Sequence, residues 1–188
     1  GKVTTLPSVN TIADGTAVKT PGSNIFPYIK KNLDDIITVE DDELIVAFLD
    51  MVENHKMIVE NSGLLTVAAL KHLGVKDKRV VSILSGGNMD VITMSSVVQQ
   101  GLIFRDRIFT VSVLLPDKPG ELAKVAQTLA DVQGNVIKLE HNQFVTTNRS
   151  AAVELRITLE CFGTEHKEQI IAALEKKGYK PRIVRTMI

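Results

Sequence analysis

The sequence predicts an α/β protein of two domains, the second of which has the ferredoxin-like order βαββαβ. Apolar and polar residues alternate over 108–115 and again over 153–161, as in strands with one buried face. Apolar residues recur at helical spacing after each of these segments, over 122–129 and 170–174. Before residue 104, short apolar runs alternate with helical segments, an order typical of a sheet with parallel strands.

Residues 1–104 are expected to form the first domain, an α/β layer. Its strands are predicted at two apolar runs rich in Ile and Val, Leu33–Val39 and Val80–Leu84. One further strand is expected among the loops of the N-terminal stretch, over Thr11–Val18.

Three helices are expected between and after these strands. The carboxylates of Glu40–Glu43 favour a helix start, and the apolar residues of 44–52 follow with helical spacing. A second helix is predicted from about Met57 to Leu73, because Gly74 is a typical residue after a helix end. A third helix is predicted after Asn88, up to about Gln100.

Residues 108–188 form the second predicted domain and follow a short junction, Gly101–Arg107. The expected helices contain Leu122 and Ile170, and the expected strands are 108–115, 135–145, 153–161 and 179–185. This order folds into a four-stranded antiparallel sheet with both helices on one face.

The composition restricts the class of protein. The chain has 22 basic and 22 acidic side chains, 4% aromatic residues and no tryptophan, so a nucleic-acid surface is not expected. No run approaches the ~18 apolar residues of a membrane span. Cys161 is the single cysteine, and the four histidines show no metal-ligand spacing. We therefore expect a cytoplasmic protein with no disulfide, metal or membrane partner.

The segment Ser85–Asn88 is the first candidate for chemistry. An apolar run that leads into two glycines and a helix presents backbone amides and a small hydroxyl at one place, as ligand-holding loops do. A plain tight turn, in which the glycines only provide positive φ, is the alternative. A nucleotide-phosphate loop is a further alternative, but the lysine and the glycine pattern of such loops are missing.

Three motifs of the first domain occur in the order and at the spacing of a known family: Thr11–Lys19, Glu60–Gly63 and Ser85–Asn88. Together they resemble the serine/threonine dehydratase family, enzymes with the fold of tryptophan synthase β, called PLP fold type II. The resemblance covers residues 1–104 as the C-terminal part of the catalytic domain. It implies pyridoxal 5'-phosphate as the cofactor.

The resemblance also implies cofactor-binding residues. The serine that matches Ser85 bonds the pyridine nitrogen of the cofactor, and a neutral hydroxyl there favours β-elimination from a substrate with a β-hydroxyl. Gly86 and Asn88 would form the same pocket wall, Gly15 would lie close to the cofactor, and Glu60 would stand near its ring.

Two parts of the family pattern do not occur in this sequence. The Schiff-base lysine and the glycine-rich phosphate loop lie upstream in the family, so no catalytic residue is assigned here. The chain thus resembles a C-terminal fragment of a threonine ammonia-lyase, which converts L-threonine to 2-oxobutanoate and ammonia, and alone it is expected to be inactive. Its missing N-terminal part would be a partner, and Gly1 without an initiator methionine favours this interpretation. The alternative is a stand-alone, non-catalytic amino-acid sensor.

The second domain resembles an ACT domain over residues 108–188. The resemblance rests on Leu115–Leu122 after the first strand and Gly134–Ile137 at the second. A helix that starts after Pro119 and Gly120 leaves amides unpaired, and an amino-acid carboxylate can bind them. The candidate effector residues are Asp117, Pro119, Gly120, Glu121 and Leu122, with Asn135, Val136 and Ile137 from a paired domain. A Pro-Gly turn that binds nothing is the alternative. The resemblance implies isoleucine or valine as the effector and a homo-oligomer formed through ACT domains.

Overall fold

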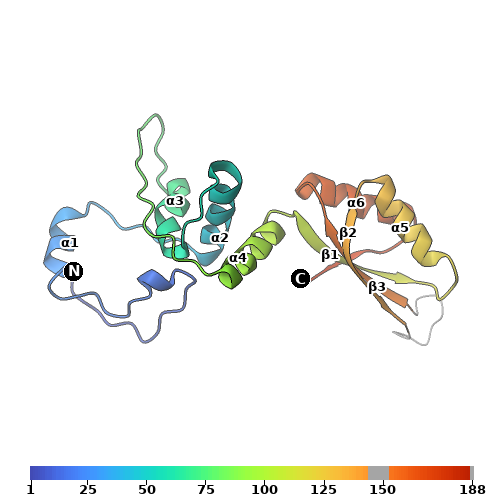
Figure 1. The fold of residues 1–188 in the computed structure, drawn as a ribbon, viewed down its shortest axis with the longest axis horizontal. Coiled ribbons are helices and arrows are strands. Elements are labelled where there is room, and N and C mark those ends of the chain that lie inside the picture. The colour runs from blue at the N-terminus through green and yellow to red at the C-terminus, as the bar shows by residue number, and fades with distance from the viewer. Residues whose placement is uncertain (144–152, 187–188) are drawn as a thin grey trace. The chain divides into compact units, whose positions relative to one another are not determined.

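The computed structural model describes residues 1–143 and 153–186 and divides into two compact units, Gly1–Gly101 and Leu102–Ile188. Figure 1 shows helices and loops in the first unit and a sheet with two helices in the second.

The second unit has the predicted ferredoxin-like fold. Its elements are β1 (Ile108–Leu115), α5 (Glu121–Asp131), β2 (Asn135–Asn142), β3 (Val153–Glu160), α6 (Thr164–Lys176) and β4 (Arg182–Val184). The four strands form one sheet in the order β2-β3-β1-β4, and every pair is antiparallel. Helices α5 and α6 lie on the same face of this sheet (Figure 1). The βαββαβ prediction is therefore confirmed.

The core of this unit lies between the sheet and its two helices. Alternate residues of the two central strands face the helices, and Val111 of β1 lies opposite Ile157 of β3 in the antiparallel register. Both side chains are 0% exposed, as are Ile170 and Leu174 of α6. Since α5 contributes Val125 and Leu129 to the same cluster, the alternation in the strands and the helical spacing combine into one apolar layer.

Two strands are shorter than expected. Strand β2 ends at Asn142 and contains a register shift between Val136 and Lys138, so Ile137 is an extra residue in the ladder. The end of the predicted strand, toward residue 145, lies outside the described residues. Strand β4 has only three residues, because just Arg182–Val184 pair with β1.

The first unit consists of helices and loops. Its elements are η1 (Asp14–Thr16), α1 (Phe26–Asn32), α2 (Asp41–Asp50), the π-helical η2 (Met51–His55), η3 (Asn61–Leu64), α3 (Leu65–Ala68), η4 (Ala69–His72) and α4 (Val91–Phe104), which extends past Gly101. Phe48 and Leu64 are 0% exposed at the centre of its core. Helix α2 begins as predicted, because Glu40 and Glu43 form a capping box around its first turn.

Three predictions for this unit are wrong. Residues 11–18, 33–39 and 80–84 form no strand in the structure, and η1 replaces the first of them. Residues 1–107 are all described, and none of them forms a strand ladder with these three segments. An extended segment without a neighbouring strand has no ladder hydrogen bonds, so its backbone groups bond mainly to water. Several apolar side chains of the three segments are exposed, at 72% for Ile36 and 87% for Val81, whereas Ala13 is buried and Ile12, Val39 and Leu84 pack against the core.

The helix expected over 57–73 is also wrong as a single helix. Met57–Glu60 are extended, and the rest is divided into η3, α3 and η4. The predicted end is right, because Gly74 has a φ of +59°. The third helix begins later than predicted, at Val91, and continues to Phe104.

Glu43 connects the start of α2 to η4. Its carboxylate accepts hydrogen bonds from the Lys71 ammonium at 2.5 Å and from His72 Nε2 at 2.9 Å. These bonds, first that of Lys71, lower the pKa of Glu43 from 4.5 to about 2. The ion pairs therefore depend on pH in the acid range.

No helix among the described residues is long and apolar enough to cross a membrane. Within the same residues, no three His, Cys, Asp or Glu side chains gather in a group that could hold a metal ion.

Candidate functional site

Two segments that lie far apart in the sequence meet at Glu60. The Glu60 carboxylate accepts a hydrogen bond from the Asn88 amide at 3.1 Å and another from the Ser62 hydroxyl at 2.9 Å. The Glu60 amide in turn donates to the Gly86 carbonyl at 3.4 Å. Glu60 thus joins the Ser85–Asn88 loop to the start of η3, and both predicted segments belong to one site.

Close backbone contacts require the glycines of this site. A Cβ on Gly86 would lie 2.4 Å from Glu60 Oε1, and the φ of +88° at Gly86 also favours glycine. A Cβ on Gly63 would lie 2.2 Å from the Ser85 carbonyl oxygen. On Gly15 it would lie 2.6 Å from Ser62 Oγ and 3.7 Å from Glu60 Oε1. The three glycine positions therefore let η1, η3 and the loop approach one another.

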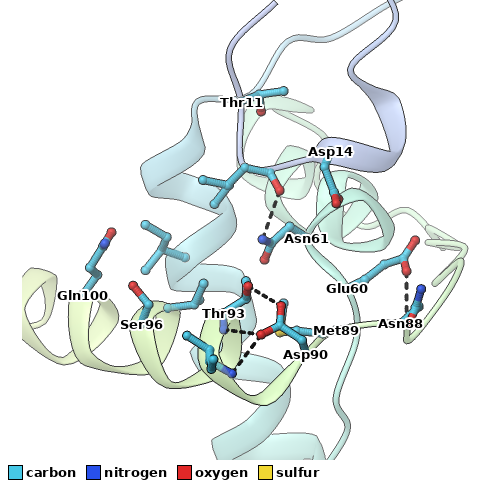
Figure 2. Close-up of a pocket in the computed structure, with 14 residues that line it drawn as sticks. Thr11, Asp14, Glu60, Asn61, Asn88, Met89, Asp90, Thr93, Ser96 and Gln100 are labelled. Atoms are coloured by element: carbon cyan, nitrogen blue, oxygen red, sulfur yellow. Dashed lines mark hydrogen bonds between the residues drawn. The ribbon is translucent and has the colours of Figure 1, made fainter.

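A cavity of about 460 Å³ lies beside this junction. Glu60 and Asn88 line it, whereas Ser85, Gly86 and Gly15 do not. Figure 2 shows side chains from η1, η3 and α4 around the cavity, with Glu60 bonded to the Asn88 amide. The five predicted cofactor residues therefore lie close together, but only two of them line the cavity.

Several polar residues of this cavity had not been predicted as site residues, among them Asn61 and Asp90. Asn61 is 5% exposed; its amide donates to the Ile12 carbonyl at 3.1 Å, but its Oδ1 has no hydrogen-bond partner among the described residues. Asp90 accepts from the amides of Ile92 and Thr93, both at 2.9 Å, and from the Thr93 hydroxyl. The hydroxyl bond, followed by the amide bond of Thr93, lowers the pKa of Asp90. An Asp three residues before a Thr at the start of a helix is a common N-cap pattern, so the role of Asp90 could have been predicted from the sequence.

Ser85 is the residue predicted to bond a pyridine ring nitrogen. Its side chain is exposed, and its hydroxyl makes no hydrogen bond to another described residue. Its backbone is fixed, because the carbonyl lies directly over Gly63. A free hydroxyl on a fixed backbone can bond a heterocyclic nitrogen, so these residues fit one end of pyridoxal phosphate.

A second candidate site lies at the start of α5. A cavity of about 350 Å³ is lined by all five predicted effector residues of this loop, Asp117, Pro119, Gly120, Glu121 and Leu122. His141 of β2 and Val153 of β3 line it as well and had not been predicted.

Backbone geometry makes the start of α5 suitable for an anionic group. Gly120 is the N-cap with a φ of +89°, and the space around its Cα is open. The amides of Glu121 and Lys124 donate to backbone carbonyls, but those of Leu122 and Ala123 have no backbone acceptor outside the helix among the described residues. The Glu121 carboxylate is paired with Lys124 Nζ at 2.7 Å, which offsets its charge. Free first-turn amides can bind a carboxylate.

The three effector residues predicted on β2 do not line this cavity. Asn135 donates to the Glu160 carboxylate at 3.0 Å, and Val136 and Ile137 are 39% and 45% exposed. Their expected role concerned a second copy of the domain, so it stays a prediction.

Comparison with known families gives a match in each half of the chain. Residues 1–86 match the model of the pyridoxal-phosphate dependent enzymes, and residues 109–178 match the ACT domain. The chain joins part of a pyridoxal-phosphate-dependent enzyme domain to an ACT domain. The cofactor of this family is therefore pyridoxal phosphate, as predicted, and the ACT match contains every predicted effector residue.

Two curated relatives have the same arrangement over most of this chain. An L-threonine ammonia-lyase of Geobacter sulfurreducens is 38% identical over 95% of the chain and 45% of its own length. An L-threonine ammonia-lyase of Thermotoga maritima is 34% identical over 93% of the chain and 44% of its own length. The chain thus spans about half the length of the curated relatives that it matches. Among solved structures, the processed form of threonine deaminase isoform 2 from Solanum lycopersicum is 29% identical, with a TM-score of 0.49, over 52% of this chain and 29% of that one.

Proposed function

We propose that this chain is the C-terminal part of a threonine ammonia-lyase that converts L-threonine to 2-oxobutanoate and ammonia, controlled by an amino acid bound to its ACT domain. The observation that carries the proposal is the meeting of two motif segments at Glu60, with the third close by at Gly15 and the free hydroxyl of Ser85 beside them. The two L-threonine ammonia-lyase relatives support the reaction class.

Ser85 would bind the ring nitrogen of pyridoxal phosphate. When bound, that cofactor supplies an electron sink for the elimination of a β-hydroxyl group. The Ser85 hydroxyl would donate a hydrogen bond to the ring nitrogen and keep its own proton, so the ring would be a weaker electron sink than one with a protonated nitrogen. Glu60 holds the Ser85–Asn88 loop in place, because it bonds the Asn88 amide and lies against Gly86.

The Schiff-base lysine and the phosphate-binding loop would come from the part of the enzyme N-terminal to these residues. This chain alone is therefore expected to be inactive. We expect the longer enzyme to be cytoplasmic and to need the contacts of both parts for activity.

In the ACT domain, isoleucine or valine would bind at the start of α5. The free amides of Leu122 and Ala123 would receive the carboxylate, and the exposed side chain of Leu122 would contact the aliphatic group. Strand β2 is a sheet edge with exposed Val136, Ile137 and Leu139, which suits pairing with a second copy. Asn135, Val136 and Ile137 of that copy would complete the pocket, so we expect an even oligomer.

Calorimetric titration of the chain with isoleucine, valine, threonine and serine tests the effector. Saturable binding of isoleucine or valine with a change in oligomer size is expected, and no binding of any of the four would refute it. Gly120→Ala should weaken binding about tenfold or more, because it strains and narrows the amide site. Gly163→Ala is a matched control, since its φ of +113° also strains a residue with a Cβ, and it lies at the start of α6 beside Cys161 rather than at the start of α5.

The reaction is tested in the longer protein that contains this chain. There, Ser85→Ala should lower kcat for threonine about tenfold or more, because the ring nitrogen loses its hydrogen-bond donor. Unchanged kcat would refute the assignment of Ser85. Binding of isoleucine by a long form that has no activity on threonine would favour the amino-acid sensor instead.

A further inference from the structure

The face of the ACT sheet opposite α5 and α6 carries polar side chains in register. Thr110 of β1 lies between Thr158 of β3 and Val184 of β4, and Lys138 of β2 continues this row beyond Thr158. Although no helix among the described residues of this unit packs on this face, Thr110 is 6% exposed and Thr158 is 4% exposed. They form the floor of a hollow of about 180 Å³, whose walls include Lys138, Arg156 and Arg185.

The two threonine hydroxyls leave one hydrogen without an acceptor. Their oxygens lie 2.9 Å apart, so one hydroxyl donates to the other. Neither hydroxyl makes another hydrogen bond to a described residue. One of the two hydrogens is therefore free, and a buried donor without an acceptor is unfavourable. The hollow above it is the place from which an acceptor can reach it.

The charge around this hollow is positive. Lys138, Arg156 and Arg185 contribute three cations; Glu140 is in the lining and Glu154 is paired with Arg156, so three cations against two carboxylates leave a balance of +1. Lys138 Nζ bonds Glu140 at 2.9 Å, and Arg156 uses only Nε to bond Glu154, at 3.1 Å. Lys138, and more weakly Arg156, lowers the pKa of Glu140, although the nearby Glu154 carboxylate raises it, so the cations outweigh the carboxylate at this position.

Arg185 adds a further cation, and among the described residues it forms no ion pair or side-chain hydrogen bond. Its guanidinium can therefore turn toward a ligand without breaking a contact of the fold.

We propose that this hollow binds a small oxyanion, a phosphate or a carboxylate group, through the free threonine hydrogen and the cations of Lys138, Arg156 and Arg185. The hollow is too small for a nucleotide, because a single water molecule occupies about 30 Å³ in the liquid. It shares no lining residue with the cavity at the start of α5. The site is thus separate from the proposed effector pocket and does not depend on it.

The test uses the whole chain and two probes, inorganic phosphate and acetate, titrated by NMR in a buffer without other oxyanions. We expect saturable shifts at the amides of Thr110, Thr158 and Val184 with at least one probe. Tighter phosphate binding would identify a phosphate group as the natural ligand class, and tighter acetate binding would identify a carboxylate.

Arg185→Gln and Arg182→Gln form a matched pair of variants. Both remove one positive charge from neighbouring exposed positions, but Arg182 does not line the hollow. Arg185→Gln should weaken the binding about tenfold, whereas Arg182→Gln should change it less than about twofold. The double variant Thr110→Val, Thr158→Val should weaken it about fivefold by removing the donor.

Two results would overturn the proposal. One is the absence of saturable shifts with both probes; the other is equal weakening by Arg185→Gln and Arg182→Gln, which would show general attraction to a positive face. Circular dichroism melting of each variant checks that the ACT fold is kept, and isoleucine binding at the α5 loop should be unaffected.

Discussion

Gly63→Ala tests the close contact that fixes the candidate cofactor loop. A Cβ at this position would lie 2.2 Å from the Ser85 carbonyl oxygen and 2.9 Å from Val59 Cγ1. Ordinary contacts need about 3.5 Å, so the loop and η3 would have to separate by roughly 1 Å. Both sides of the contact are backbone or buried side chain, which cannot turn away.

The expected cost follows from this overlap. Overfilling a packed site costs about 1–3 kcal/mol, and we expect the upper end, about 3 kcal/mol, because the obstacle is backbone. Gly87→Ala is the matched control in the same loop. Its Cβ would meet nothing closer than the Ile58 carbonyl at 3.6 Å, so its effect should stay within about 1 kcal/mol.

Hydrogen exchange measured by mass spectrometry separates the two units of the chain. For Gly63→Ala, peptides that cover residues 57–73 should exchange about 100-fold faster, which corresponds to about 3 kcal/mol of opening free energy. A peptide from β3 should keep its rate. Equal exchange in Gly63→Ala and Gly87→Ala would refute the close packing of Gly63 against Ser85.

Three further predictions concern stability. Ile157→Ala, at a side chain that is 0% exposed in the ACT core, should lower the free energy of unfolding by about 2–5 kcal/mol in urea denaturation, and a loss below about 1 kcal/mol would contradict the packing. His166→Ala should cost about 2–4 kcal/mol in the same assay, because the Val132 carbonyl loses its donor at 2.6 Å and the Phe162 amide its acceptor at 3.1 Å. The pKa of Glu43 is lowered from 4.5 to about 2, so its contribution is complete above pH 4.5 and is lost as pH falls toward 2; Glu43→Gln should remove this part of the acid dependence in a pH series of thermal melts, and an unchanged series would be the contrary result.

The sequence of residues 108–188 contains nearly all the information for its fold. Strands β1 and β3 alternate so regularly that their buried faces can be read directly, and each finds its partner within the same 81 residues. The structure differs from the predicted strands in details such as the bulge at Ile137 and the shortness of β4. Both depend on which residues pair between strands rather than on the side-chain pattern.

The candidate sites could be predicted in part. The motifs gave Glu60, Ser85 and the loop at Gly120, because glycines and a helix start leave local signals. Asn61 and the hydroxyl pair of Thr110 and Thr158 gave no signal in the sequence. They matter because of the hydrogen bonds that they form or lack in the folded structure.

The sequence by itself determined the ACT fold, the helix start at Glu40–Glu43 and the glycine positions, because these depend on local periodicity, capping and backbone freedom. Only the tertiary structure decided that 33–39 and 80–84 are not strands, and that the distant motifs meet around Glu60. The physical reason is that a strand is stabilised by its neighbours and a site by its contacts, and neither is encoded within one segment.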